Sequence, residues 1–356
     1  MSNPYIVGRP LFDPEDFYGR KEEVKEIFSD IKNLIPISLV GIRGIGLTSL
    51  LHYISHPSVV RKYLNIDHYI VTYIDFAVFG QYSEEQFWGE ILNQMNKSAK
   101  KSRRTSIMNL LRDKGSNIQD IYRIFEDLSS NDIRAVFCFD GFEKVKRNPN
   151  FDRHFFDNLR HFVTAYSNIT YITATRRKLG DLNLPTDILS SPLFTYFICK
   201  RIGFLEEKET EDLILKPSEK EGVQLNEDDV NFVFDVAYCH PFFVQSTCHE
   251  IFQYRQRKNK IHGEKMKQNT YEGIKKILYQ NFKNYFDYYW KLLDYDQKKR
   301  LKSLCKCEAR VLEDEGVISS LEELCLIRKG SSGFSLFSSP FRKFCIKKKI
   351  WKEPFG

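Results

Sequence analysis

One segment of the sequence has residue types and a spacing that suit the binding of phosphate. Residues 41–49 read G-I-R-G-I-G-L-T-S, and Gly41, Gly44 and Gly46 leave backbone N–H groups open to a ligand. An apolar run precedes this segment and a helical pattern follows it, so the glycines lie between a strand and a helix. N–H groups at the start of a helix attract anions. We therefore expect a segment descended from a phosphate-binding loop rather than a simple tight turn.

The loop lacks one residue that such loops use. The pattern G-x-x-x-x-G-K-[ST] has a lysine where this chain has Leu47. That lysine brings a positive charge to the β- and γ-phosphates, which leucine cannot do. Thr48 keeps the position that holds magnesium, and Ser49 is an alternative ligand. Arg43 and Arg176 are the two candidates for replacing the lost charge.

A second candidate site follows the buried strand expected at residues 135–140. An aspartate at the carboxyl end of such a strand, here Asp140, can bind magnesium through water. The next position commonly holds a glutamate that activates the attacking water, and here it is Gly141. Loss of a general base lowers a rate by about 10²–10⁴-fold. The alternative is that Asp140 only caps a turn.

A third candidate, Arg176, follows the strand expected at residues 169–175. Its guanidinium suits phosphate oxygens, so it could respond to a γ-phosphate. Alternatively, it is a surface arginine that opens a loop.

The elements that must position these residues alternate between strand and helix. Apolar, β-branched runs separated by helical patterns indicate a parallel sheet covered by helices on both faces. The expected strands are residues 35–40, 69–76, 135–140, 169–175 and 194–202. The fold class is therefore α/β, with the glycine loop directly after the first strand.

The remainder of the chain is predicted to be mostly helical. Helices are expected at residues 206–215, 227–238, 242–256, 264–289, 296–305 and 320–325. Strands at 326–329 and 334–337 flank a glycine–serine turn, which predicts a hairpin and, with the preceding helices, a winged helix. We expect three domains: a P-loop core at residues 1–203, a helical lid at 204–285, and a winged-helix-like domain with a basic tail at 286–356.

Composition limits the possible functions. The 356 residues are 42% hydrophobic and 28% charged, which is typical of a folded domain rather than a disordered chain. No apolar run reaches the roughly 18–20 residues of a membrane span, and the start of the sequence has no signal-peptide pattern. The eight cysteines contain no C-x-x-C pair, which favours reduced, structural thiols. We expect a cytoplasmic protein without a membrane partner.

The net charge of +7 is unevenly distributed. Basic residues gather in three runs, at residues 97–104, 255–267 and 342–352. The first interpretation is a set of solvated faces or loops, and the second is contact with nucleic acid or another anionic surface.

Together these motifs resemble the STAND branch of the AAA+ ATPases. The segment at residues 17–23, with Arg20, is similar to the family's N-terminal G-R-x-E segment, which lines the nucleotide base. The loop resembles Walker A, and residues 140–143 resemble a Walker B motif of D-E-F-E type. Residues 238–245 resemble the lid motif G-H-P-x-x-x-Q, in which the proline, here Pro241, meets adenine.

The resemblance implies ATP or ADP with Mg²⁺ as the ligand, held by Arg20, the loop, Asp140, Arg176 and Pro241. This chain departs from the family at Leu47, Gly141 and Cys239, which stand for the Walker A lysine, the Walker B acid and the lid glycine. The first two losses favour a pseudo-ATPase with no catalytic residue, which binds nucleotide weakly, statically or not at all. Such a protein would act as a regulatory or assembly subunit with a protein partner or a second copy. The alternatives are a working nucleotide switch that drives oligomerisation, and an origin-recognition-like protein that binds DNA through its basic winged-helix region.

Overall fold

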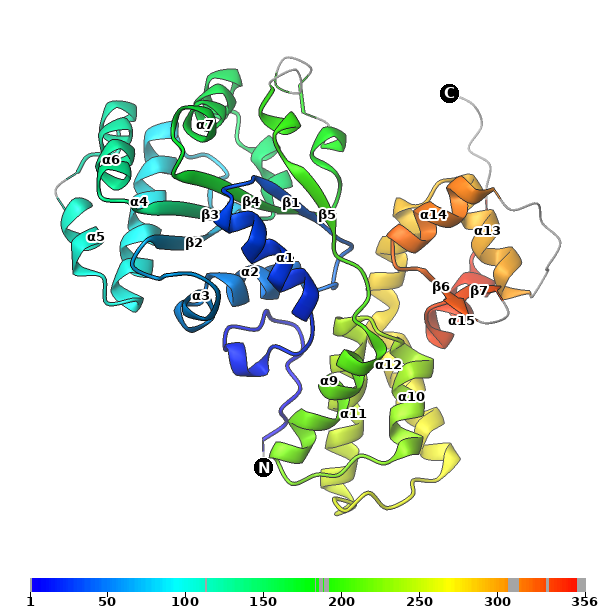
Figure 1. Cartoon of the computed structure of the whole chain (residues 1–356). Helices are drawn as coiled ribbons and strands as arrows, with labels where there is room; N and C mark the ends of the chain where they lie inside the picture. The colour runs from blue at the N-terminus through cyan, green and yellow to red at the C-terminus, as the bar shows by residue number, and fades with distance from the viewer. Residues whose placement is uncertain are drawn as a thin grey trace.

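The computed structural model describes residues 2–112, 114–182, 184–185, 188, 192–306, 314–330 and 333–350. Three parts follow one another along the chain: a core built on a sheet, a helical lid, and a smaller C-terminal unit (Figure 1). Part of the predicted hairpin turn (residues 331–332), Cys307 and the end of the basic tail (351–356) lie outside the described residues.

The core contains the predicted parallel sheet. Its five strands run in the order β2-β3-β4-β1-β5, and each neighbouring pair is parallel. The strands are β1 (Ile37–Val40), β2 (Tyr69–Asp75), β3 (Arg134–Asp140), β4 (Ile169–Thr175) and β5 (Ile198–Arg201). The fifth strand is shorter than predicted, because residues 192–195 form a 3-10 helix before it.

Helices cover both faces of this sheet (Figure 1). Alternate residues of β3 show the two faces: Val136 and Cys138 belong to one hydrophobic cluster, and Phe137 and Phe139 to another. The α-helices of the core are α1 (Lys21–Lys32), α2 (Leu47–Ser55), α3 (Pro57–Tyr63), α4 (Glu84–Lys101), α5 (Thr105–Leu110), α6 (Ile118–Ser130) and α7 (Arg153–Ala165). Short 3-10 helices are η1 (Pro14–Asp16), η2 (Phe76–Val78), η3 (Phe142–Arg147), η4 (Leu179–Asp181) and η5 (Pro192–Thr195).

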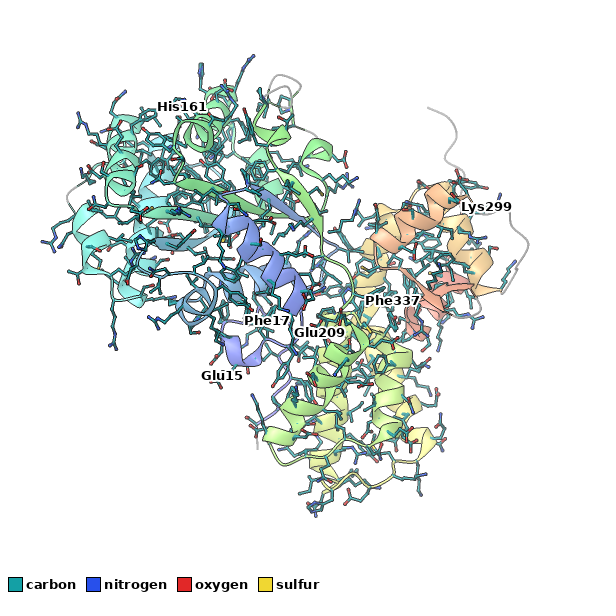
Figure 2. The ribbon with its side chains drawn as sticks, in the orientation of Figure 1. Glu15, Phe17, His161, Glu209, Lys299 and Phe337 are labelled. Carbon is teal, nitrogen blue, oxygen red and sulfur yellow. The ribbon has the colours of Figure 1, made fainter. Side chains whose placement is uncertain are left out.

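The lid is helical, as predicted. It contains α9 (Glu207–Lys220), α10 (Glu227–Ala237), α11 (Pro241–Arg257) and the long α12 (Gln268–Leu292). Glu209 on α9 joins this part to the core, since its carboxylate accepts hydrogen bonds from the backbone N–H groups of Arg20 and Lys21 (Figure 2). The expected domain boundary after residue 285 falls inside α12, which continues without a break into the C-terminal unit.

The C-terminal unit contains the predicted hairpin. Strands β6 (Ile327–Gly330) and β7 (Gly333–Leu336) pair antiparallel after α13 (Tyr295–Cys305) and α14 (Glu315–Glu323). The basic tail also forms a helix, α15 (Ser339–Lys347), that the sequence reading missed. Its lysines face outward, while Phe341, Phe344 and Cys345 are buried against the rest of the protein. The winged-helix assignment stays a prediction.

Two of the basic runs are not simple solvated faces. Arg104 is buried and donates hydrogen bonds to the carbonyls of Tyr69 and Asp67 at one edge of the sheet. Arg255 is fully buried, and its Nε donates to Asp229 at 2.8 Å. For these two arginines the predicted exposure is wrong, because partners distant in the sequence neutralise their charge or satisfy their donors. In the part of the chain that the structure describes, no helix is long and apolar enough to cross a membrane.

Candidate phosphate-binding pocket

The glycine loop follows β1 and leads directly into α2. Gly44 and Gly46 have φ angles of 88° and 100°, in the left-handed region that favours glycine. At Gly41, a Cβ would lie 2.7 Å from Ile45 Cγ2, so a side chain there would clash with the loop itself. The sequence therefore folds here into the tight, exposed turn that the motif predicts, and α2 begins at Leu47.

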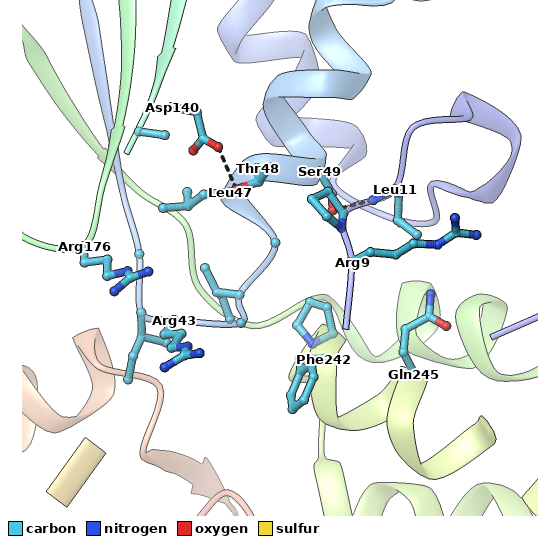
Figure 3. A pocket seen from close by; sticks show the side chains of 18 of the residues that line it. Arg9, Leu11, Arg43, Leu47, Thr48, Ser49, Asp140, Arg176, Phe242 and Gln245 are labelled. Carbon is cyan, nitrogen blue, oxygen red and sulfur yellow. Dashed lines mark hydrogen bonds between the residues drawn. The ribbon is translucent and has the colours of Figure 1, made fainter. Parts of the chain in front are cut away.

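A cavity of about 340 Å³ opens over this loop. Four parts of the chain line it: the loop, the carboxyl ends of β3 and β4, the N-terminal segment at residues 6–18, and the lid together with α12. Figure 3 shows side chains from these parts facing one space, with Asp140 and Thr48 on one side and Phe242 and Gln245 on another. Its volume lies in the range of small-molecule sites.

The two residues predicted to hold magnesium are brought together. Thr48 Oγ1 donates a hydrogen bond to Asp140 Oδ2 at 2.9 Å, across 92 residues of sequence (Figure 3). Tyr73 on β2 donates to the same oxygen, also at 2.9 Å. Burial, and then the nearby Asp140 charge, raise the pKa of the Tyr73 hydroxyl, so this group remains a donor. The carboxylate is therefore fixed in orientation beside the first turn of α2.

The two neighbours of Thr48 also line the pocket, but they make other contacts. Leu47 is half-buried and packs against the hydrophobic core. Ser49 Oγ accepts a hydrogen bond from the Leu11 N–H at 3.1 Å, which ties the N-terminal segment to α2 (Figure 3). Ser49 thus has a positioning contact, and its part as a magnesium ligand stays a prediction.

Arg20 lines the pocket, but its guanidinium is occupied by the protein. Four of its donor hydrogen bonds go to Glu23 and to the carbonyls of Phe204, Ile45 and Gly203. The side chain is only 4% exposed. Arg20 therefore connects α1, the glycine loop and the strand-to-lid connection, and this geometry does not favour it as a direct ligand.

Arg43 and Arg176 both lie near tyrosines of α12. The Arg43 guanidinium is 4.9 Å from the centre of the Tyr285 ring, and that of Arg176 is 5.9 Å from the Tyr288 ring. Arg176 also lies 3.6 Å from Glu143 Oε1. The other carboxylate oxygen of Glu143 is buried and has no hydrogen-bond partner among the described residues. Sequence reasoning assigned no role to Glu143 beyond its place in the motif.

Gly141 begins η3 in the left-handed conformation, with φ 63°. A Cβ at this position would lie 2.8 Å from Lys144 Nζ, because the lysine side chain folds back over the glycine. Lys144 Nζ also lies 3.2 Å from Asp75 Oδ1, at the end of the neighbouring strand β2. Nothing in the sequence pattern singled out Lys144, since its position depends on the turn that follows β3.

The start of the lid helix α11 packs against the glycine loop. Pro241 is the first residue of α11 and lines the pocket, as the resemblance implies. The preceding His240 is completely buried, and this burial, with a smaller contribution from Arg20, lowers its pKa to about 3. Tyr289 of α12 donates a hydrogen bond to the Arg43 carbonyl at 2.7 Å.

Cys239, which stands at the position of the lid glycine, is also buried. Burial raises the pKa of its thiol to about 11, so it is an inert thiol.

The N-terminal segment is the part of the pocket that the sequence described least well. The Ile6 N–H donates to Gln245 Oε1 on α11 at 3.2 Å, and Leu11 is bonded to α2 as described above. Residues 6–11 therefore cross the pocket from the lid to the core. Arg9 lies on this segment and adds a cation to the lining (Figure 3).

Comparison with known proteins identifies the fold. No family model matches the sequence, and no curated protein is significantly similar to it. A Walker-type ATPase of Pyrococcus abyssi superposes with a TM-score of 0.63 at 13% identity, covering 97% of this chain and 100% of that one. The ORC2 protein of Aeropyrum pernix, in ADPNP–ADP complexes, gives 0.53 at 10% identity, covering 96% and 94%. The chain has an AAA+-type P-loop ATPase fold.

This AAA+-type fold explains why the candidate residues converge. In open parallel sheets, ligands bind beyond the carboxyl ends of the strands, which is where the loop after β1, Asp140 after β3 and Arg176 after β4 lie. At identities this low the likeness shows the fold alone, so the STAND subtype stays a prediction.

Proposed function

We propose that this protein binds ATP or ADP with Mg²⁺ in the pocket over the glycine loop and hydrolyses it slowly or not at all. It would then act as a regulatory or assembly subunit that pairs with a second copy or another protein. The observation that carries this proposal is the 2.9 Å contact between Thr48 and Asp140, in a site that has neither the loop lysine nor the following acid.

The residues present fit a nucleotide and its metal ion. The loop conformation and the N-terminus of α2 suit an anion, and the cavity is large enough for a small molecule. The hydroxyl of Thr48 and the carboxylate of Asp140 are the hard oxygen ligands that Mg²⁺ prefers. Bound Mg²⁺ would offset phosphate charge, while the protein contributes orientation and the loop N–H groups.

Slow turnover follows from two positions. Leu47 offers no charge to a developing phosphate charge, and Gly141 offers no group that could take a proton from water. The scaffold of the site is retained while two groups used in hydrolysis are missing.

A slowly hydrolysing switch is the second candidate function, and Glu143 favours it. This carboxylate lines the pocket, and its Oε2 has no hydrogen-bond partner in the described structure. A carboxylate so placed could orient water in place of position 141. Under this alternative, Glu143→Gln abolishes the residual turnover; under the first proposal, it changes nothing.

DNA binding receives less support. Several of its proposed basic contacts are used within the protein: Arg328 lies over the Tyr238 ring, Lys343 over the Tyr279 ring, and Lys348 pairs with Asp287. A binding assay at two salt concentrations tests this function, because phosphate contacts produce a steep salt dependence.

The deciding experiment measures binding and turnover on the same purified chain. Calorimetry with MgATP and MgADP should give one nucleotide per chain, and phosphate release should stay below about 0.01 per second. Thr48→Ala and Asp140→Asn should weaken the magnesium-dependent part of binding. The absence of binding at millimolar nucleotide, or turnover near 1 per second, contradicts the proposal.

A further inference from the structure

The space next to Asp140 is filled by a cation. At Gly141, a Cβ would meet three atoms of Lys144: Nζ at 2.8 Å, Cε at 2.9 Å and Cδ at 3.4 Å. The lysine therefore lies where a side chain at position 141 would begin. The glycine and the folded lysine depend on each other, because any larger residue at 141 would displace the ammonium.

This ammonium faces the pocket and is not fully used by its partner. Lys144 lines the cavity together with Asp140 and the glycine loop. Its pairing with Asp75 at 3.2 Å joins two side chains that are 26% and 42% exposed. Ion pairs between side chains of this exposure contribute little to stability. An ammonium also has three N–H donors, so Lys144 can bind a second anion at little cost in its interaction with Asp75.

The other cations that line the pocket are Arg9, Arg20, Arg43 and Arg176, and of these Arg20 is the most firmly held. Arg20 donates to Glu23 and to three backbone carbonyls. Arg43 lies over two tyrosine rings, and Arg176 lies near both Glu143 and Tyr288. Lys144 differs from these arginines in its place over Gly141, the residue after Asp140, and lysine carries a compact charge on a flexible stem.

We propose that Lys144 is the phosphate-binding cation of this pocket, in place of the lysine that Leu47 has replaced. This inference rests on the proposed function. The charge has moved from the loop to the segment after β3, into the space of the missing acid. A protonated lysine there holds a terminal phosphate, but it cannot accept a proton from water. The pocket should therefore prefer a nucleoside triphosphate to a diphosphate and retain it.

The test compares nucleotide affinities of three variants with those of the native chain. Lys144→Met keeps the apolar stem and removes the charge; it should weaken binding of a non-hydrolysable ATP analogue about tenfold and of ADP much less. Lys146→Met, on an exposed lysine of the same 3-10 helix, is the matched control and should change neither affinity. The double variant Leu47→Lys with Lys144→Met should recover the lost affinity.

Asp75→Asn separates phosphate binding from a structural ion pair. If Lys144 only pairs with Asp75, Lys144→Met and Asp75→Asn lower the thermal stability by the same amount. In that case neither variant changes the ratio of ATP to ADP affinity. If Lys144 binds phosphate, Asp75→Asn frees the ammonium and keeps or improves triphosphate binding. Equal triphosphate affinity of Lys144→Met and the native chain overturns this inference alone. Failure of the native chain to bind either nucleotide overturns the proposed function, and this inference with it.

Discussion

At the glycine loop, Thr48 keeps the residue type that the motif requires, whereas its neighbour Leu47 does not. Thr48 contacts Asp140, whereas Leu47 is half-buried and packs against the hydrophobic core. The backbone of the loop depends on its glycines rather than on residue 47, so the substitution removes a charge and leaves the turn unchanged. Under the proposed function, nucleotide binding and hydrolysis can therefore be separated by mutation.

Leu47→Lys should tighten MgATP binding about tenfold, because it adds a charge-assisted contact to phosphate. Phosphate release should remain below about 0.01 per second, since position 141 still lacks a base. Calorimetry and a phosphate-release assay measure the two quantities. A variant that turns over near 1 per second would show that the loop lysine was the only defect.

His240 makes stability depend on pH. Its pKa is about 3 in the folded protein and near 6.5 when unfolded, so only the unfolded chain takes up its proton as the pH falls below about 6.5. Stability from this residue is complete at pH 7.5 and falls by about 2 kcal/mol at pH 5.

Urea unfolding at pH 7.5 and 5 tests this prediction against His240→Phe. The phenylalanine fits a site already surrounded by Phe204, Phe243 and Phe337, and it cannot titrate. The stability difference between the two pH values should be smaller in the variant by that amount. An unchanged difference would mean that His240 does not carry it.

At the scale of elements, α12 connects the glycine loop to the C-terminal unit. Its tyrosines contact Arg43 and Arg176, while Phe286 packs against Phe341 of α15. Phe337, after the hairpin, packs against Phe243 of the lid, so the three parts meet around this helix (Figure 2). Helix α12 therefore contacts both the glycine loop and the C-terminal unit.

Tyr289→Phe should loosen this connection by about 1 kcal/mol, the value of one buried hydrogen bond, because the Arg43 carbonyl loses its donor. Hydrogen exchange should become faster in residues 41–46. Tyr288→Phe is the control, since its ring contacts remain. Equal exchange in both variants would argue against a role for the Tyr289 hydroxyl.

The strands and most helices could be read from the sequence because their patterns are local. β4 matches its predicted range, and the loop, Thr48 and Asp140 meet as the motif requires. Helix α15 was missed because its lysines hide the apolar face formed by Phe341 and Phe344. Lys144 and residues 6–11 reach the pocket through turns and long-range contacts, which no local pattern encodes.

At the scale of the whole molecule, a buried charge pair links three helices of the lid. Asp229 on α10 accepts hydrogen bonds from Arg255 on α11 and, at 2.8 Å, from Tyr271 on α12. Both charged side chains are fully buried. Three lid helices thus share one carboxylate.

Asp229→Asn should destabilise the protein by about 3–5 kcal/mol, because it leaves the Arg255 charge buried and uncompensated. Denaturant unfolding measures the loss. Arg257→Met is the control, since Arg257 is an exposed residue of α11, the helix that carries Arg255. This variant should have little effect on the stability. A similar change in both variants would mean that the buried pair is not what stabilises the lid.

Residues 6–11 have a kinetic consequence. This segment spans the pocket between Gln245 of the lid and Ser49 of α2 through two single hydrogen bonds. Under the proposed function, a nucleotide in this pocket would leave faster when those two bonds open, so its residence time would depend on residues 6–11 as well as on the groups that bind phosphate. Two proteins with the same pocket and different N-terminal segments could then have the same nucleotide affinity and different dissociation rates.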